Sequence, residues 1–253
     1  MEDRATKLAR LGRLRRNLPH MSQSALTAVL REAQREPLPR VSRRDDLRFV
    51  RNAVADQSTP YGTVHTQVPL AREDGSIWLL ECQCLWAMLY ATAKWSSGFS
   101  RLIASTLARC GPSTPQNPWK LAIYCDEVDP GDPLSSTHGR KFQAVYWSLL
   151  TFGLAVLWHE ECWFTACTAR TDEVKHVVGG MSAVIAAILT HAFLGTHDPA
   201  VGGIVLDLFD GTQVRIFIVF DMFVADEKAV QEVVCTRGAN AELPCFCCRH
   251  SSG

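Results

Sequence analysis

The chain lacks the short motifs that identify several common enzyme classes. It contains no G-x-S-x-G nucleophile motif, no G-x-x-x-x-G-K-[ST] phosphate loop and no G-x-G-x-x-G dinucleotide fingerprint. It also contains no internal repeat and no low-complexity tract. The sequence therefore gives no support to an α/β-hydrolase, a P-loop NTPase or a Rossmann enzyme, and we expect no small-molecule cofactor.

The chain has no net charge, but its charges are unevenly distributed. Residues 1–51 carry 13 Lys and Arg against 6 Asp and Glu, a net charge of +7, and the remaining residues carry −7. Arg4–Leu18 and Ser22–Arg35 have the spacing of helices, the first of them basic and amphipathic. Residues 1–51 could bind DNA, and Arg13-Leu14-Arg15-Arg16 could direct the protein to the nucleus; a basic arm that is merely soluble is the alternative.

The features of a secreted protein are also missing. Met1–Arg16 is charged throughout and has no apolar segment of a signal peptide, so we expect an intracellular protein whose ten cysteines are reduced. Six of these cysteines lie in apolar surroundings and are predicted to be core thiols: Cys82, Cys84, Cys110, Cys125, Cys162 and Cys167.

Two uncharged runs, Phe142–Trp158 and His176–Gly195, have nearly the length of membrane spans. A buried strand and a buried helix explain them equally well, because apolar runs alone do not separate these cases. We therefore expect no membrane association, and a small membrane protein remains a third alternative.

From Tyr61 onward the pattern predicts an α/β (α+β) fold. The expected elements are a hairpin of Tyr61–Leu70 and Ile77–Leu80, helices at Cys82–Ala93 and Ser100–Cys110, strands at Lys120–Cys125, Lys141–Phe152 and Glu161–Thr171, a helix at Asp172–Leu194, a hairpin of Gly203–Phe209 and Gln213–Phe220, and a helix at Asp226–Cys235. Three successive strands, a helix and another strand are the element order of a ribonuclease-H-like core. We expect a partial core of this kind, a mixed sheet with flanking helices.

The predicted organisation has four parts. They are a basic helical arm and linker at 1–58, a lead-in subdomain of helices and a hairpin at 59–118, the ribonuclease-H-like core at 119–235, and a Cys-rich loop, a truncated zinc loop, at 236–253.

Two aspartates are the candidate catalytic residues. Asp126 ends an apolar strand, where a charge is costly unless it is paired or holds a metal. Asp226 follows 100 residues later, where another apolar run ends, and Asp221 competes for the same role. In a ribonuclease-H-like core such acids lie side by side and could hold Mg²⁺ or Mn²⁺ for phosphoryl transfer. A structural ion pair is the alternative, and Glu127 is expected to face away from Asp126.

A second group of candidate ligands lies near residue 250. Cys245 and Cys248 form a C-x-x-C motif, and His250 could supply a third ligand for Zn²⁺, with Cys235 as a fourth. The motif supplies only half of a typical zinc site, so reduced surface thiols are the alternative. His159-Glu160-Glu161-Cys162 also contains ligand types, but no second cluster matches it.

Four stretches resemble a large multi-copy family of uncharacterised dinoflagellate proteins: Thr59–Gly62, Pro118–Leu134, Arg140–Ser148 and Arg237–Cys248. That family is similar, more remotely, to the catalytic cores of DDE transposases of the Plavaka and CACTA-like kind. The resemblance implies that Asp126 and Asp226 bind metal and that Cys245 and Cys248 bind zinc. The third acid of such a core, expected on a later helix, is not found before the chain ends.

The sequence thus predicts a transposase-derived protein that keeps a remnant of a divalent-metal site for DNA strand cleavage or transfer and is inactive alone. A non-catalytic DNA- or protein-binding scaffold with a zinc loop is the alternative.

Overall fold

A computed structural model describes residues 23–35, 58–129 and 141–226, and the single residues 230 and 233. The chain divides into two units, Met1–Arg51 and Asn52–Gly253. In the first unit, helix α2 spans Gln23–Arg35 and confirms the helix expected at Ser22–Arg35. The helix expected at Arg4–Leu18 and the one expected after Asp226 lie largely or wholly outside the described residues, as does the Cys-rich loop.

The second unit contains strands and short helices in mixed order. Its strands are β1 (Ser58–Thr59), β2 (Gly62–Thr63), β3 (His65–Ala71), β4 (Ile77–Gln83), β5 (Trp119–Val128), β6 (Phe142–Leu149), β7 (Phe164–Arg170), β8 (Ile204–Asp207), β9 (Gln213–Ile216) and β10 (Ile218–Ala225). Its helices are α4 (Leu85–Trp95), α5 (Ser97–Cys110), α6 (Leu154–Leu157), α7 (Thr171–Val174) and α8 (Gly180–Phe193), with 3₁₀ turns η1 (Leu150–Phe152) and η2 (Glu160–Cys162).

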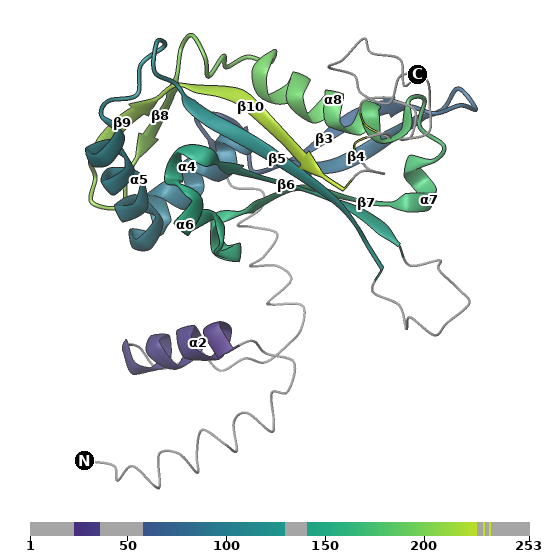
Figure 1. The fold of residues 1–253 in the computed structure, drawn as a ribbon. Helices are drawn as coiled ribbons and strands as arrows, with labels where there is room; N and C mark the ends of the chain where they lie inside the picture. The colour runs from purple at the N-terminus through teal and green to yellow at the C-terminus, as the bar shows by residue number, and fades with distance from the viewer. Residues whose placement is uncertain (1–22, 36–57, 130–140, 227–229, 231–232, 234–253) are drawn as a thin grey trace, which may run out of the picture. The chain divides into compact units, whose positions relative to one another are not determined.

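Six strands form one mixed sheet in the order β10-β5-β6-β7-β4-β3 (Figure 1). Strands β5, β6 and β7 form an antiparallel meander, whereas β10 pairs with β5 in parallel. Among the described strands, β8 and β9 form a separate two-stranded ribbon, as do β1 and β2. The structure thus confirms the mixed α/β class and the mixed sheet with flanking helices.

The two faces of this sheet differ in what covers them. On β5, Leu121, Ile123 and Cys125 point to a fully buried side, which we call the core face. Ala122, Tyr124 and Asp126 point to the other side, which we call the open face, because successive strand residues alternate. Helices α4, α5 and α8 pack on the core face (Figure 1). On the open face, α6 and η2 line a pocket together with β5.

Aromatic side chains hold the helices against the core face. Trp86 of α4 makes edge-to-face contacts with Trp147 of β6 and Phe193 of α8, at centroid distances of 6.3 and 5.5 Å. Phe99 of α5 makes similar contacts with Phe152 and Phe164. Such pairs add specific geometry to the burial of large apolar surfaces, and they orient the helices relative to the sheet.

The segment 59–118 shares the sheet and the core with the residues that follow it. Strand β4 joins β7 through the pairing of Cys82 with Cys167. Side chains of α4 and α5 belong to the same hydrophobic cluster as those of β5 and β6. The hairpin and the two helices predicted for this segment are present, and most of their buried side chains join the core of the strands that follow. A smaller cluster of Val64, Cys84, Ala87 and Ala91 belongs to this segment alone.

The long helix predicted at Asp172–Leu194 is wrong, because two helices and a loop occupy these residues. α7 ends at Val174, and α8 begins only at Gly180. In between, the Val178 amide donates to the carbonyl of Ala71 at 2.9 Å, so the chain runs along the β3–β4 hairpin. Gly179 then takes φ of +85°, a value that favours glycine, and α8 starts in a new direction.

Two further boundaries differ from the prediction. β6 ends at Leu149, and the 3₁₀ turn η1 occupies Leu150–Phe152, where the predicted strand continued. β9 ends at Ile216, because Phe217 leaves the ribbon: its amide donates to Ser113 Oγ at 2.8 Å, and its carbonyl accepts from the Trp119 amide at 2.7 Å. These contacts turn the chain into β10, a strand that the sequence pattern did not separate from the hairpin.

The predicted core thiols are only partly confirmed. Cys82, Cys84, Cys125 and Cys167 are buried, but Cys162 is half-buried and Cys110 is exposed in the last turn of α5. All six are free thiols, as expected. No helix in the described part of the chain is long and apolar enough to cross a membrane.

Two buried tryptophans provide a matched test of this packing. The Trp86 indole N–H donates to the Ala192 carbonyl at 2.6 Å and so satisfies one of the carbonyls left open in the last turn of α8. The Trp147 indole N–H finds no acceptor among the described residues. We expect Trp86→Phe to lower the free energy of unfolding by about 1 kcal/mol more than Trp147→Phe, as measured by urea denaturation. Equal losses would show that the hydrogen bond contributes nothing.

Candidate metal centre

Asp126 lies near the carboxyl end of β5, on the open face. The strand keeps Leu121, Ile123 and Cys125 in the core, and alternation places Asp126 on the same side as Tyr124. The Asp126 side chain is therefore half-buried beside solvent and does not enter the core. This position explains how an apolar strand can end in a charge.

A bulge in β10 sets the position of Asp226. The pairing runs from Phe220 opposite Leu121 directly to Met222 opposite Ala122. Asp221 is therefore the extra residue of a bulge and lies opposite no residue of β5. From there the register continues to Ala225 opposite Cys125, and the next residues on the two strands are Asp226 and Asp126. Without the extra residue, Asp226 would fall opposite Glu127. The bulge thus aligns the two aspartates on neighbouring parallel strands.

Asp226 also lies on the open face. Met222 and Val224 line the same pocket as Ala122, Tyr124 and Asp126, and Asp226 continues this alternation. The electrostatics of Tyr124 agree with this position. Burial raises the pKa of Tyr124 above its usual value; a hydrogen bond with Asp126 and then the negative charges of Asp126 and Asp226 raise the pKa further. Both carboxylates therefore act on the same phenol.

Asp221 and Glu127, two further acids on these strands, contact neighbouring side chains. Asp221 forms an ion pair with Lys120, with 2.9 Å between Oδ1 and Nζ. Glu127 faces away from Asp126, as predicted, and its carboxylate accepts from Lys141 Nζ at 3.1 Å and from Thr171 Oγ1 at 3.0 Å. Asp221 thus secures the bulge and Glu127 ties β5 to the start of α7, while Asp126 and Asp226 are the pair that share one face.

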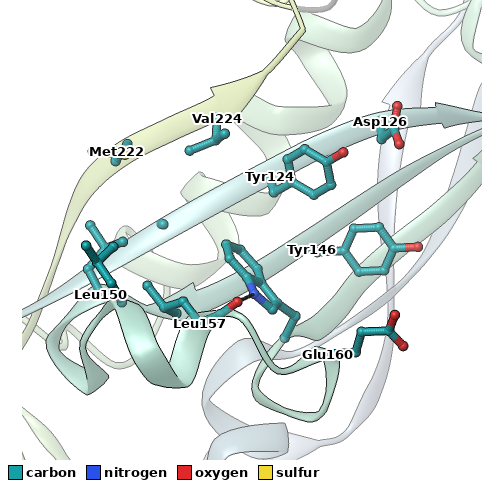
Figure 2. Close-up of a pocket in the computed structure, with 11 residues that line it drawn as sticks. Tyr124, Asp126, Tyr146, Leu150, Leu157, Glu160, Met222 and Val224 are labelled. Carbon is teal, nitrogen blue, oxygen red and sulfur yellow. Dashed lines mark hydrogen bonds between the residues drawn. The ribbon is translucent and has the colours of Figure 1, made fainter.

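A pocket of about 790 Å³ opens beside Asp126 on the open face. It is lined by Ala122, Tyr124, Asp126, Tyr146, Leu150, Leu154, Leu157, Glu160, Trp163, Met222 and Val224. Figure 2 shows the hydroxyl and carboxylate groups of Tyr124, Tyr146, Asp126 and Glu160 toward one end of this pocket, and Leu150, Leu157 and Met222 toward the other. The pocket therefore has a polar end beside Asp126 and an apolar end.

Sequence reasoning identified Asp126 but gave no role to the rest of this pocket. The sequence offers Glu160 only as a ligand type without a matching cluster, and it assigns Tyr146 no role in a site. Tyr146 reaches the site because it pairs with Tyr124 across β5 and β6, and Glu160 reaches it because η2 folds back over the sheet. Only the alternation of Tyr124 with Asp126 could have indicated an aromatic wall.

The predicted zinc ligands Cys245, Cys248 and His250, and also Cys235, lie outside the described residues. Within the residues that are described, no group of three or more His, Cys, Asp or Glu side chains is arranged to hold a metal ion. Asp126 and Asp226 thus remain a pair of candidate ligands.

Comparison with family models and with curated proteins found no match for this chain.

The chemistry of the aspartate pair suits Mg²⁺ or Mn²⁺. Magnesium prefers oxygen ligands, keeps several of its waters and is often held by one or two carboxylates together with substrate phosphates. Two carboxylates at adjacent strand ends, one of which lines an open pocket, offer oxygen ligands of this kind. The pair is compatible with a metal whose remaining ligands are water and a phosphate.

The position of Asp226 can be tested through Tyr124. We expect Asp226→Asn to lower the Tyr124 pKa toward its usual value of 10.0, because a nearby negative charge opposes formation of the phenolate. Asp221→Asn removes the same charge from the same strand and serves as the control. NMR titration of ring-labelled tyrosine measures both. A Tyr124 pKa that responds equally to both substitutions would show that Asp226 has no special proximity.

Proposed function

We propose that this protein derives from a divalent-metal phosphoryl-transfer enzyme acting on DNA, with a ribonuclease-H-like core. In this proposal Asp126 and Asp226 are the retained metal-binding pair. The observation that carries it is the parallel register of β10 and β5, whose last pair, Ala225 and Cys125, is followed by an aspartate on each side. The antiparallel meander, the intervening helix and the parallel fourth strand support the same ancestry.

The chemical argument begins with the charges at the strand ends. Two carboxylates on one face repel each other, and a metal ion between them is one of the ways to relieve that repulsion, besides a positively charged side chain or a proton. A bound divalent metal would polarise a phosphodiester and stabilise the negative charge that develops when it is attacked. The role of the chain is to position both carboxylates with a rigid sheet, while Lys120 neutralises Asp221 nearby.

The resemblance to Plavaka and CACTA-like transposase cores agrees with this assignment, because it relates the same two aspartates to metal binding. We propose that the isolated chain retains metal binding and carries out little or no strand cleavage. Zinc binding by Cys245, Cys248 and His250 belongs to the same proposal. It would stabilise a loop and is independent of the aspartate pair.

Metal binding provides a test that does not require activity. We expect the wild-type chain to bind Mn²⁺ and the variants Asp126→Asn and Asp226→Asn each to bind it about tenfold more weakly, because each removes one carboxylate ligand. Titration followed by electron paramagnetic resonance measures free Mn²⁺ directly. Asp221→Asn is the matched control and should bind as the wild type does.

Two results would contradict this assignment. If Asp221→Asn weakens binding as much as Asp226→Asn, general charge and not a site attracts the ion. If the wild type nicks DNA with Mg²⁺ and Asp126→Ala abolishes the nicking, the chain is an active enzyme and not a remnant.

The basic unit favours DNA as the partner, whether or not chemistry remains. Residues 1–51 carry +7, and they form a unit distinct from the one that holds the sheet. A non-catalytic DNA-binding scaffold would use this unit alone, through contacts with phosphates that release counterions.

Charge neutralisation in the full chain tests the role of the basic unit. We expect Arg13→Gln, Arg15→Gln and Arg16→Gln together to weaken DNA binding and to reduce the slope of log K against log salt by about 2–3, or roughly 0.9 for each phosphate that is no longer neutralised. The control replaces Arg101, Arg170 and Lys175, three exposed cations of the other unit, by Gln. Equal effects of the two triple variants would remove the basic unit from the proposal.

A further inference from the structure

The pocket beside Asp126 has a lining that selects against anions. Its polar groups are two tyrosine hydroxyls and the carboxylates of Asp126 and Glu160, and no Lys, Arg or His is among the described residues that line it. A phosphate inside it would meet negative charge on two sides. The lining therefore favours an occupant that donates hydrogen bonds and carries no negative charge, even where the adjoining acids hold a metal ion and a phosphate.

Aromatic rings form one wall of the pocket. Tyr124 and Tyr146 lie on adjacent strands with their ring centroids 6.1 Å apart and their planes 20° apart. Trp163 meets Tyr124 edge-to-face at 6.2 Å, and its indole N–H donates to the Leu157 carbonyl at 2.9 Å, which fixes the ring. Aromatic side chains on neighbouring strands of an open sheet face are a common platform for unpaired bases, because every base has a stacking face.

We propose that this pocket binds one unpaired nucleobase of a DNA strand whose neighbouring phosphate lies at Asp126 and Asp226. The inference rests on the proposed function, because the pocket shares Asp126 with the metal pair. The base would stack on the tyrosine wall, with the apolar end of the pocket, formed by Leu150, Leu157 and Met222, against its far edge.

The polar end of the pocket distinguishes a base from an apolar protein side chain. An apolar side chain would cover Asp126, Glu160 and two hydroxyls without offering them hydrogen bonds, and buried polar groups without partners are costly. A base carries N–H donors at its edge, and carboxylates accept hydrogen bonds from the amino group of cytosine in other protein–DNA contacts. The combination of stacking wall and acceptors thus matches a nucleobase.

The test compares two strands of the same length and charge, in EDTA and again with Ca²⁺. One is a short deoxycytidine strand, and the other has abasic sites throughout. We expect the full chain to bind the deoxycytidine strand more tightly. Tyr146→Leu should weaken that binding by about tenfold and leave binding of the abasic strand unchanged, because stacking is removed while the phosphate interactions remain. Fluorescence anisotropy measures the dissociation constants.

Two further variants keep the test independent of folding. Leu154→Glu places a carboxylate at the pocket wall on a side chain that is 78% exposed, so it should weaken base binding without disturbing the core. Phe209→Leu removes an exposed aromatic ring beyond the end of β8, outside the pocket, and should change neither strand's affinity. Thermal unfolding confirms that the variants are folded.

The outcomes separate this inference from the proposed function. If both strands bind equally, or if Tyr146→Leu weakens both equally, the base pocket is wrong even where Mn²⁺ binds to the aspartate pair. If Leu154→Glu abolishes self-association in sedimentation velocity and leaves the contrast between strands unchanged, the pocket accepts a protein segment, which also overturns the inference. If the contrast persists where Mn²⁺ binding fails, the pocket is confirmed and the metal assignment alone is wrong.

Discussion

The parallel pairing of β10 with β5 is the constraint on which the candidate site depends. It brings together two aspartates that are 100 residues apart, and it does so only because one extra residue, Asp221, is accommodated in a bulge. A shift of one residue in a strand moves every side chain to the opposite face, so register decides whether an acid faces solvent or the core. The Lys120–Asp221 ion pair links the bulge to β5. The alignment of Asp126 with Asp226, the electrostatics of Tyr124 and the β10 side of the pocket all follow from this register.

Local signals in the sequence were sufficient for much of the fold. The turns at Asp74-Gly75 and Asp210-Gly211 predicted both hairpins, because such residues tolerate the backbone of tight turns. The aromatic-rich strand after Lys141 and the buried strand before Asp126 were equally clear. The break in the helix at Gly179 could not be predicted, because it depends on a hydrogen bond from the Val178 amide to the carbonyl of Ala71, far earlier in the chain. The start of β10 likewise depends on Phe217 contacting Ser113. Periodicity cannot show contacts of this kind.

The candidate site likewise has one part that local sequence signals predict and another that depends on contacts between distant segments. Asp126 could be predicted, since a charge ending a buried strand requires a local explanation. The choice of Asp226 over Asp221 rested on where the apolar run ended, and the structure gives the two residues different surroundings. Tyr146 and Glu160 required the folded sheet, because each reaches the pocket from another element. Cys245, Cys248 and His250 remain predictions, as does the descent from a transposase. What the sequence could not supply was register, which is a property of two strands together.

The order of strands in the sheet also has a kinetic consequence. The meander β5-β6-β7 pairs segments that are close in sequence, whereas both flanks of the sheet are closed by distant segments: Cys82 meets Cys167 on one side, and Ala225 meets Cys125 on the other. Pairings between distant segments form slowly, because the entropy of closing a long loop is given up before any new interaction compensates for it. The three-stranded meander should therefore form early and display Asp126 on an edge strand. Asp226 reaches its place beside β5 only when β10 docks, so the two aspartates are aligned late in folding.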